Sequence, residues 1–170
     1  METALKVPVQ PTEGLAVLGS ALAAFCAVLW LGALLGVSFL ATPVKFQAPS
    51  LDLPTALDVG RVTFALFSRV EWGLCAVLLV GMVIGRDSAV RLASGAGLVL
   101  LLLIQALWLL PVLDARVGEI IAGTAVPSSR HHVLYVGTEV AKAILLLGLG
   151  VSAVWRWTTQ SQAGRSIPCA

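Results

Sequence analysis

The sequence predicts an all-α membrane protein in which four transmembrane helices form an antiparallel bundle. Two features of the composition carry this prediction: of the 170 residues, 58% are hydrophobic and only 12% are charged. Soluble domains average about 45–50% apolar and about 25% charged residues. A soluble enzyme of this composition would expose large apolar surfaces to water, and a disordered chain would contain far fewer hydrophobic residues. The net charge of +2 argues against nucleic-acid binding as the main function.

The third feature is the spacing of long apolar runs. A helix needs about 20 apolar residues to cross a bilayer, and the runs 15–44 and 92–113 reach this length without a charge. Two further runs carry charges. The run 133–155 contains two charged residues, and the run 72–85 is too short to cross unless its helix extends back through Glu71 and Arg69. We expect transmembrane helices at about 15–41, 59–85, 92–113 and 131–157 in a domain spanning 15–157, with an N-terminal tail at 1–14 and a C-terminal tail at 158–170.

Capping residues and prolines mark the expected helix ends. Asp58 is a candidate N-cap for the second helix, and Ser128 and Ser129 are candidates for the fourth. Prolines end the first helix and leave a loop at 42–57, because proline lacks the amide hydrogen that a helix interior requires. The apolar residues of this loop suggest that it lies on the membrane surface, with a segment that dips in over the polar residues as the alternative. The prolines are Pro43, Pro49 and Pro54.

Small residues inside the spans predict how the helices pack. Gly32 and Gly36 form a G-x-x-x-G pattern, which allows two helix backbones to approach closely. We expect packing within the chain, and a homodimer through these two glycines is the alternative. Cys26 and Cys75 are interpreted as small packing residues, because no C-x-x-C pair is present.

Four spans place both termini on one side of the membrane. Basic residues on that side outnumber the acidic ones, whereas the bases of the opposite side are matched by acids. The positive-inside rule therefore favours cytoplasmic termini. The bases of the termini side are Lys6, Arg86, Arg91, Arg156 and Arg165.

Ionisable residues gather towards the opposite, non-cytoplasmic side. Charges inside a bilayer are costly, so they rarely face lipid and often mark a functional site. His131, Tyr135, Glu139 and Lys142 recur at helical spacing and share one stripe of the fourth helix. Gln105 is polar near the middle of the third helix. The full set of candidate binding or proton-relay residues is Arg69, Glu71, Asp114, Arg116, His131, His132, Tyr135, Glu139 and Lys142.

These residues are expected to pair across helices. Glu139 and Lys142 are three residues apart and can pair with each other. We expect Glu139 to pair also with Arg69, and Glu71 to pair with either Lys142 or Arg116. Such pairs could serve only to fix the helix register, or they could form a binding or proton-handling site.

The leading functional hypothesis is a non-enzymatic membrane protein with a polar, charged pocket that binds or relays a small polar species or protons. Its core would be Arg69, Glu71, Glu139 and Lys142. One alternative is an accessory subunit of a larger membrane complex. Another is a redox protein that binds a metal or haem through His131 and His132, with Glu139 as a further candidate metal ligand, although no cofactor is predicted and no known metal-ligand spacing is present. The sequence contains no nucleophile or phosphate-loop motif that would indicate an enzyme.

Short motifs also carry a family resemblance. They comprise Trp30–Leu31–Gly32, Gly36–Val37–Ser38–Phe39, Pro43, Phe46, Gly60–Arg61 and Phe64, followed by Leu110–Pro111, Asp114, Arg116 and His131–His132. In these motifs, residues 28–150 resemble bacterial four-helix membrane proteins of a domain of unknown function. That family is distantly similar to a eukaryotic small transmembrane protein linked to metal-drug resistance. The resemblance implies four spans and a histidine near the fourth helix, but no reaction. We expect the protein to lie in the bacterial inner membrane. Tyr135, Glu139 and Lys142 depart from the family pattern.

Overall fold

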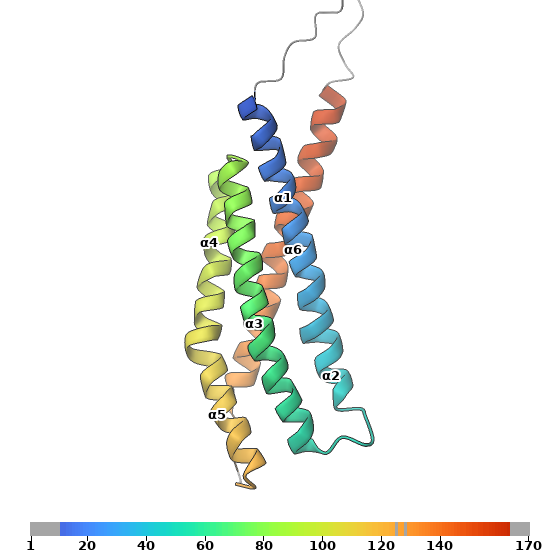
Figure 1. The fold of residues 1–170 in the computed structure, drawn as a ribbon, viewed down its shortest axis with the longest axis vertical. Helices are drawn as coiled ribbons and strands as arrows, with labels where there is room; N and C mark the ends of the chain where they lie inside the picture. Colours follow the sequence, from blue (N-terminus) through green and yellow to red (C-terminus); the bar gives the residue numbers. More distant parts are fainter. Residues whose placement is uncertain (1–10, 125, 128, 164–170) are drawn as a thin grey trace, which may run out of the picture.

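The computed structural model describes residues 11–124, 126–127 and 129–163 of the chain. They form four long antiparallel helical rods. The first rod begins at the same end of the bundle at which the last rod ends (Figure 1). We call this the termini end, and the opposite end, which carries α2 and α5, the loop end. The rods are α1 (Pro11–Leu34) with η1 (Leu35–Ala41) and α2 (Thr42–Lys45); α3 (Leu53–Ile84); α4 (Ala89–Ile104) with η2 (Gln105–Leu109) and α5 (Leu110–Ile121); and α6 (His131–Ala163).

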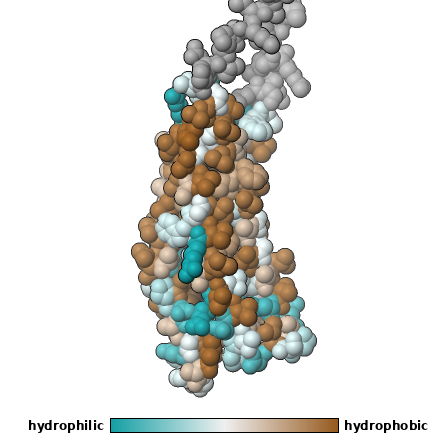
Figure 2. All heavy atoms as spheres, viewed as in Figure 1, coloured by the Kyte–Doolittle hydropathy of each residue, from teal (hydrophilic) through white to brown (hydrophobic). Residues whose placement is uncertain are grey.

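Each rod contains a stretch that is long and apolar enough to cross a membrane, and no β-strand occurs within the described ranges. The predicted fold class is therefore confirmed. Apolar side chains cover most of the visible outer surface, while polar residues gather at the loop end (Figure 2). An outward-facing apolar surface with a few buried polar groups is the arrangement that lipid requires.

The helices extend further than the expected spans. The first begins at Pro11, the second at Leu53, the third continues to Ile121 and the last to Ala163. Hydropathy marks only the lipid-crossing part of a helix, whereas backbone hydrogen bonding continues into the polar turns beyond it. The expected tails and loops are shorter as a result, and nothing is described for residues 1–10 or 164–170.

The N-cap of α3 differs from the expected one. Asp52 caps this helix by accepting a hydrogen bond from the Thr55 backbone N–H at 3.1 Å, and hydrogen bonds from Thr55 lower the pKa of this carboxyl. Asp58 instead pairs with Arg61 one turn further on, at 2.7 Å. For α6, Ser129 Oγ accepts a hydrogen bond from the His131 N–H, as expected, while Ser128 lies outside the described residues.

Two π-helical segments allow the chain to remain helical through prolines. In η1 the Thr42 N–H bonds to Val37 O, five residues back, and Pro43 follows directly. In η2 the Leu110 N–H bonds to Gln105 O in the same way before Pro111. A proline ring crowds the carbonyl four residues earlier in an α-helix, and the wider π turn relieves this crowding. The expectation that prolines end the first helix at about residue 41 was therefore wrong: the helix runs to Lys45.

Close helix packing occurs at glycines other than the expected pair. A Cβ atom on Gly81 of α3 would lie 2.9 Å from Ala23 N and 3.0 Å from Gly19 O of α1. At Gly32 and Gly36 the same atom would meet nothing within 4 Å. The expected close packing within the chain at the G-x-x-x-G pattern was therefore wrong, while its alternative role in a homodimer stays a prediction. Cys26 and Cys75 are buried packing residues, as expected.

A buried ion-pair group holds the termini end. Asp87, in the link between α3 and α4, contacts Arg91 at 3.0 Å and Arg156 at 2.6 Å. Arg91 also donates to Leu149 O at 2.9 Å and to the Ser152 hydroxyl. This group ties α4 to α6, so the two ends of the bundle are fixed by different polar contacts.

Replacing Gly81 with Ala should destabilise the bundle by about 1–3 kcal/mol, because the added methyl group would press on the α1 backbone. The matched control is Gly32→Ala, which meets open space and should be neutral or stabilising by up to about 1 kcal/mol through helix propensity. Unfolding in mixed detergent micelles measures both variants. Equal effects of the two substitutions would contradict the packing described for α1 and α3.

Candidate functional site

Three ionisable side chains meet in the bundle interior. Lys142 Nζ of α6 lies 2.5 Å from Glu71 Oε1 of α3 and 2.7 Å from Glu139 Oε1 of its own helix. Each of the three residues is at most 1% exposed. We call Glu71, Glu139 and Lys142 the carboxylate–lysine cluster.

The helix geometry explains why these groups converge. Glu139 and Lys142 are three residues apart, so they lie on the same face of α6. Tyr135, one turn before Glu139, is also buried on this face. Glu71 is one of the buried positions of α3. A long flexible lysine side chain bridges the two helices, so the cluster joins α3 to α6.

Neutral donors from the other two rods complete the surroundings of the cluster. Trp30 Nε1 donates to Glu71 Oε1 at 3.0 Å. Ser38 Oγ donates to Glu139 Oε2 at 2.8 Å, and Gln105 Nε2 donates to Glu139 Oε1 at 2.7 Å. All four rods therefore contribute a side chain to the same polar contact.

The two π-helical segments supply two of these donors. Ser38 lies within η1 and Gln105 is the first residue of η2, and both reach Glu139. A π turn changes the direction of the side chains that follow it, and such turns are frequent at functional sites. The sequence signal for each is a proline shortly after the polar residue, Pro43 for η1 and Pro111 for η2.

The cluster contains two carboxylates and one ammonium group. With all three ionised it carries a net charge of −1. Within the described residues, no other cation lies within ion-pair distance of either carboxylate to offset this charge. The hydrogen-bond donors are also shared unequally between the two carboxylates. Glu139 accepts hydrogen bonds on both oxygens, whereas every donor to Glu71 from the described part of the chain meets Oε1. Hydrogen bonds to a carboxylate favour its ionised form, so Glu71 is the carboxyl better suited to hold a proton.

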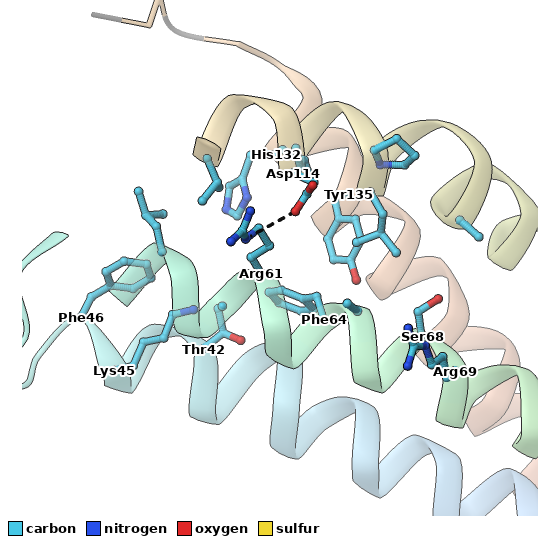
Figure 3. Close-up of a pocket in the computed structure, with 18 of the residues that line it drawn as sticks. Thr42, Lys45, Phe46, Arg61, Phe64, Ser68, Arg69, Asp114, His132 and Tyr135 are labelled. Atoms are coloured by element: carbon cyan, nitrogen blue, oxygen red, sulfur yellow. Dashed lines mark ion pairs between the residues drawn. The ribbon is translucent and has the colours of Figure 1, made fainter. Parts of the chain in front are cut away.

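A cavity of about 700 Å³ opens beside the cluster at the loop end. We call it the vestibule. Its walls are mainly apolar, and Figure 3 shows Tyr135, Ser68 and Arg69 at the inner end with Lys45 and Arg61 nearer the mouth. Its lining residues include Thr42, Lys45, Gly60, Arg61, Phe64, Ser68, Arg69, Trp72, Leu110, Asp114, His132 and Tyr135.

Tyr135 and Trp72 connect the vestibule to the cluster. Both line the cavity, and each lies on the helix that carries a cluster carboxylate. Tyr135 packs edge-on against Phe64 with ring centroids 5.3 Å apart, and Trp72 is the residue after Glu71. The three cluster residues do not themselves line the cavity, and on each of these two helices Trp72 and Tyr135 are the lining residues nearest in sequence to the carboxylates.

The vestibule is electropositive. Arg61 is paired with Asp58 at 2.7 Å and with Asp114 at 3.5 Å. For Lys45 and Arg69 no carboxylate in the described segments lies within ion-pair distance. Lys45 Nζ lies over the Phe46 ring, 5.0 Å from its centroid. Lys45, Arg61 and Arg69 carry three positive charges, and Asp114 and Asp58 carry two negative charges, so the cavity and its ion pairs have a net charge of +1.

The site residues predicted from the sequence fall into two groups in the structure, and two of them belong to neither group. Glu71, Glu139 and Lys142 form the cluster, and the Glu71–Lys142 and Glu139–Lys142 pairs were expected. Arg69, Asp114, His132 and Tyr135 line the vestibule. Arg116 contacts the Pro127 carbonyl, and His131 contacts Ser129, so neither lines it.

One expected pairing was wrong, and of the two alternatives for Glu71 only Lys142 occurs. Arg69 does not pair with Glu139, because its side chain is exposed to the vestibule while Glu139 is buried on the α6 face. Arg116 does not pair with Glu71, which Lys142 occupies. His131, His132 and Glu139 do not assemble as ligands: within the described residues, no three His, Cys, Asp or Glu side chains are grouped to hold a metal ion.

Sequence reasoning missed several residues of the site. Trp30 and Ser38 were not identified as donors, and Lys45 and Arg61 were not placed beside Arg69. A tryptophan in the middle of a span is one usable signal for Trp30, since buried indole N–H groups need an acceptor.

These features define a four-helix integral membrane protein with a buried ionisable cluster beside a cavity. The chain belongs to the family described as domain of unknown function DUF4149, whose model matches residues 25–118, more than half of the chain. The matched region includes Trp30, Ser38, Glu71 and Gln105 but ends before Glu139 and Lys142. Comparisons with curated proteins and with solved structures found no match.

Replacing Lys142 with Met should destabilise the protein by about 3–5 kcal/mol, because among the described residues Lys142 is the only counter-charge of two buried carboxylates. Unfolding in mixed detergent micelles measures the effect. Lys45→Met is the matched control: this lysine is half-buried at the vestibule, and its loss should cost about 1 kcal/mol or less.

The double variant Glu139→Gln with Lys142→Met should be more stable than Lys142→Met alone, since it leaves a single carboxyl that becomes neutral on protonation. A Lys142→Met variant as stable as the Lys45→Met control would contradict the described ion pairing.

Proposed function

We propose that this protein binds a proton reversibly at the carboxylate–lysine cluster and exchanges it with water through the vestibule. The observation that carries the proposal is the charge imbalance: two buried carboxylates share one ammonium group. A net charge inside the bilayer is strongly unfavourable. Uptake of one proton makes the cluster neutral without any change in the fold.

The proton is assigned to Glu71. Glu139 accepts donors on both oxygens, from Ser38, Gln105 and Lys142, which favours its ionised form. Glu71 Oε2 receives no donor from the described residues. In the protonated state the cluster holds Lys142 as ammonium, Glu139 as carboxylate and Glu71 as a neutral acid.

The access route supports exchange with one side of the membrane. The vestibule lies at the loop end, and the proposed route from it to the carboxylates runs past Tyr135 and Trp72, which line it. The termini end offers no comparable route among the described residues, because Asp87, Arg91 and Arg156 are paired there and apolar side chains fill the core. The excess of basic residues at the termini favours cytoplasmic termini, so the proposed exchange is with the non-cytoplasmic side of a bacterial inner membrane.

Infrared spectroscopy of the protein in lipid nanodiscs tests the proposal. A protonated carboxylic acid absorbs at a frequency distinct from carboxylate. We expect one buried acid band near neutral pH that shifts on transfer to D₂O and disappears as the pH is raised, because the proton leaves the cluster. Glu71→Gln should remove this band.

The matched control is Glu119→Gln, an exposed glutamate of α5 outside the cluster and the vestibule. This variant should keep the band. The absence of an acid band from the wild-type protein, or its persistence in both Glu71→Gln and Glu139→Gln, would contradict the proposal.

A further inference from the structure

The vestibule contains a cation that the proton-binding proposal does not use. Arg69 lies at the inner end of the cavity, within a helix stretch that crosses the membrane. It is eight residues beyond Arg61 on α3, which corresponds to about 12 Å along the helix axis. An arginine at this depth needs a compensating anion or water. No carboxylate of the described chain lies within ion-pair distance of it.

The mouth of the vestibule holds a second cation without a carboxylate partner. Lys45 Nζ occupies the space that Gly60 leaves open, where a Cβ atom would clash with it. Arg61 nearby pairs with two carboxylates, Asp58 and Asp114, so this group carries a net charge of −1 that offsets Lys45. The net positive charge of the cavity therefore lies at its inner end, on Arg69, where it attracts anions and raises their local concentration.

The remaining lining fits an apolar body better than a bare ion. Phe64 lies between Arg61 and Arg69 in Figure 3, and Trp72 and Leu110 are further apolar residues of the lining. The volume of about 700 Å³ is in the usual range of pockets for small organic molecules, which are mainly apolar with a few polar groups that fix orientation. A free inorganic ion would gain nothing from these walls.

We propose that the vestibule binds an amphiphilic anion, an acidic group attached to an apolar body, with the acid held by Arg69. The planar guanidinium can donate two parallel hydrogen bonds to a carboxylate or a phosphate. The Ser68 hydroxyl lies beside Arg69 at the inner end and offers a further donor (Figure 3). The apolar body extends towards the mouth along Phe64 and Leu110.

This inference names a ligand class for the cavity of the proposed function, but its experiment measures binding directly and needs no proton movement. Failure of either test therefore leaves the other standing. Isothermal titration calorimetry is done on the full chain in nanodiscs of zwitterionic lipid, with empty nanodiscs as the background. The probes are octanoate, octyl phosphate, acetate, inorganic phosphate and octanol.

We expect saturable binding of octanoate, octyl phosphate or both, at one site per chain. Preference between these two identifies the acidic group as carboxylate or phosphate, and either result supports the proposal. Acetate and inorganic phosphate lack the apolar body, and octanol lacks the charge, so these three should not bind. Absence of saturable binding by both amphiphiles, or equal binding of octanol or of the two small anions, would overturn the proposal.

Arg69→Gln should weaken the binding by about tenfold or more, which is the expected loss for one charge-assisted bidentate contact. Arg130→Gln is the matched control, because Arg130 is exposed at the same end but does not line the vestibule. It should leave the affinity unchanged. Arg69→Lys keeps the charge and provides a second variant if Arg69→Gln does not fold; it should weaken binding less than the glutamine substitution. Unchanged affinity in Arg69→Gln or in Arg69→Lys would overturn the assignment of the acid to Arg69. A loss of affinity in Lys45→Gln that is larger than the loss in Arg69→Gln would overturn it as well.

Discussion

The contacts of Lys142 Nζ with Glu71 and Glu139, at 2.5 and 2.7 Å, are the constraint on which the rest of the structure depends. Buried charges in an apolar interior are stable only when each is closely paired and hydrogen-bonded. This requirement fixes α3 against α6. It also explains why Trp30, Ser38 and Gln105 point into the interior, because they supply the donors that the carboxylates need.

The irregular parts of the helices are consistent with the same requirement. Both π-helical segments lie beside prolines, and both deliver a donor to Glu139. The opposite end of the bundle is held differently, by the paired group around Asp87 and by the close approach of Gly81 to α1. Paired charges therefore hold one end of the bundle, whereas the vestibule lies at the other, and this asymmetry underlies both proposals.

Composition and run length were sufficient to predict the fold class, and the spacing of Glu139 and Lys142 was sufficient to predict their pairing. The partners from other helices could not be derived in the same way. Trp30 and Ser38 reach the cluster only through the approach of α1 and a π turn, which leave no periodic signal. The G-x-x-x-G pattern at Gly32 misled because small residues mark a possible contact without showing which face is occupied; the actual contact joins glycines of two different helices. Arg69 was expected in an ion pair because a cavity able to solvate it cannot be seen in the sequence.

The proposed function requires the cluster to hold two carboxyl groups in different protonation states. Solid-state NMR of the protein labelled with ¹³C at the glutamate carboxyl carbons measures this directly, with Glu71→Gln and Glu139→Gln used to assign the two signals. Near neutral pH we expect a protonated Glu71 and an ionised Glu139. Two ionised carboxylates under these conditions would contradict it.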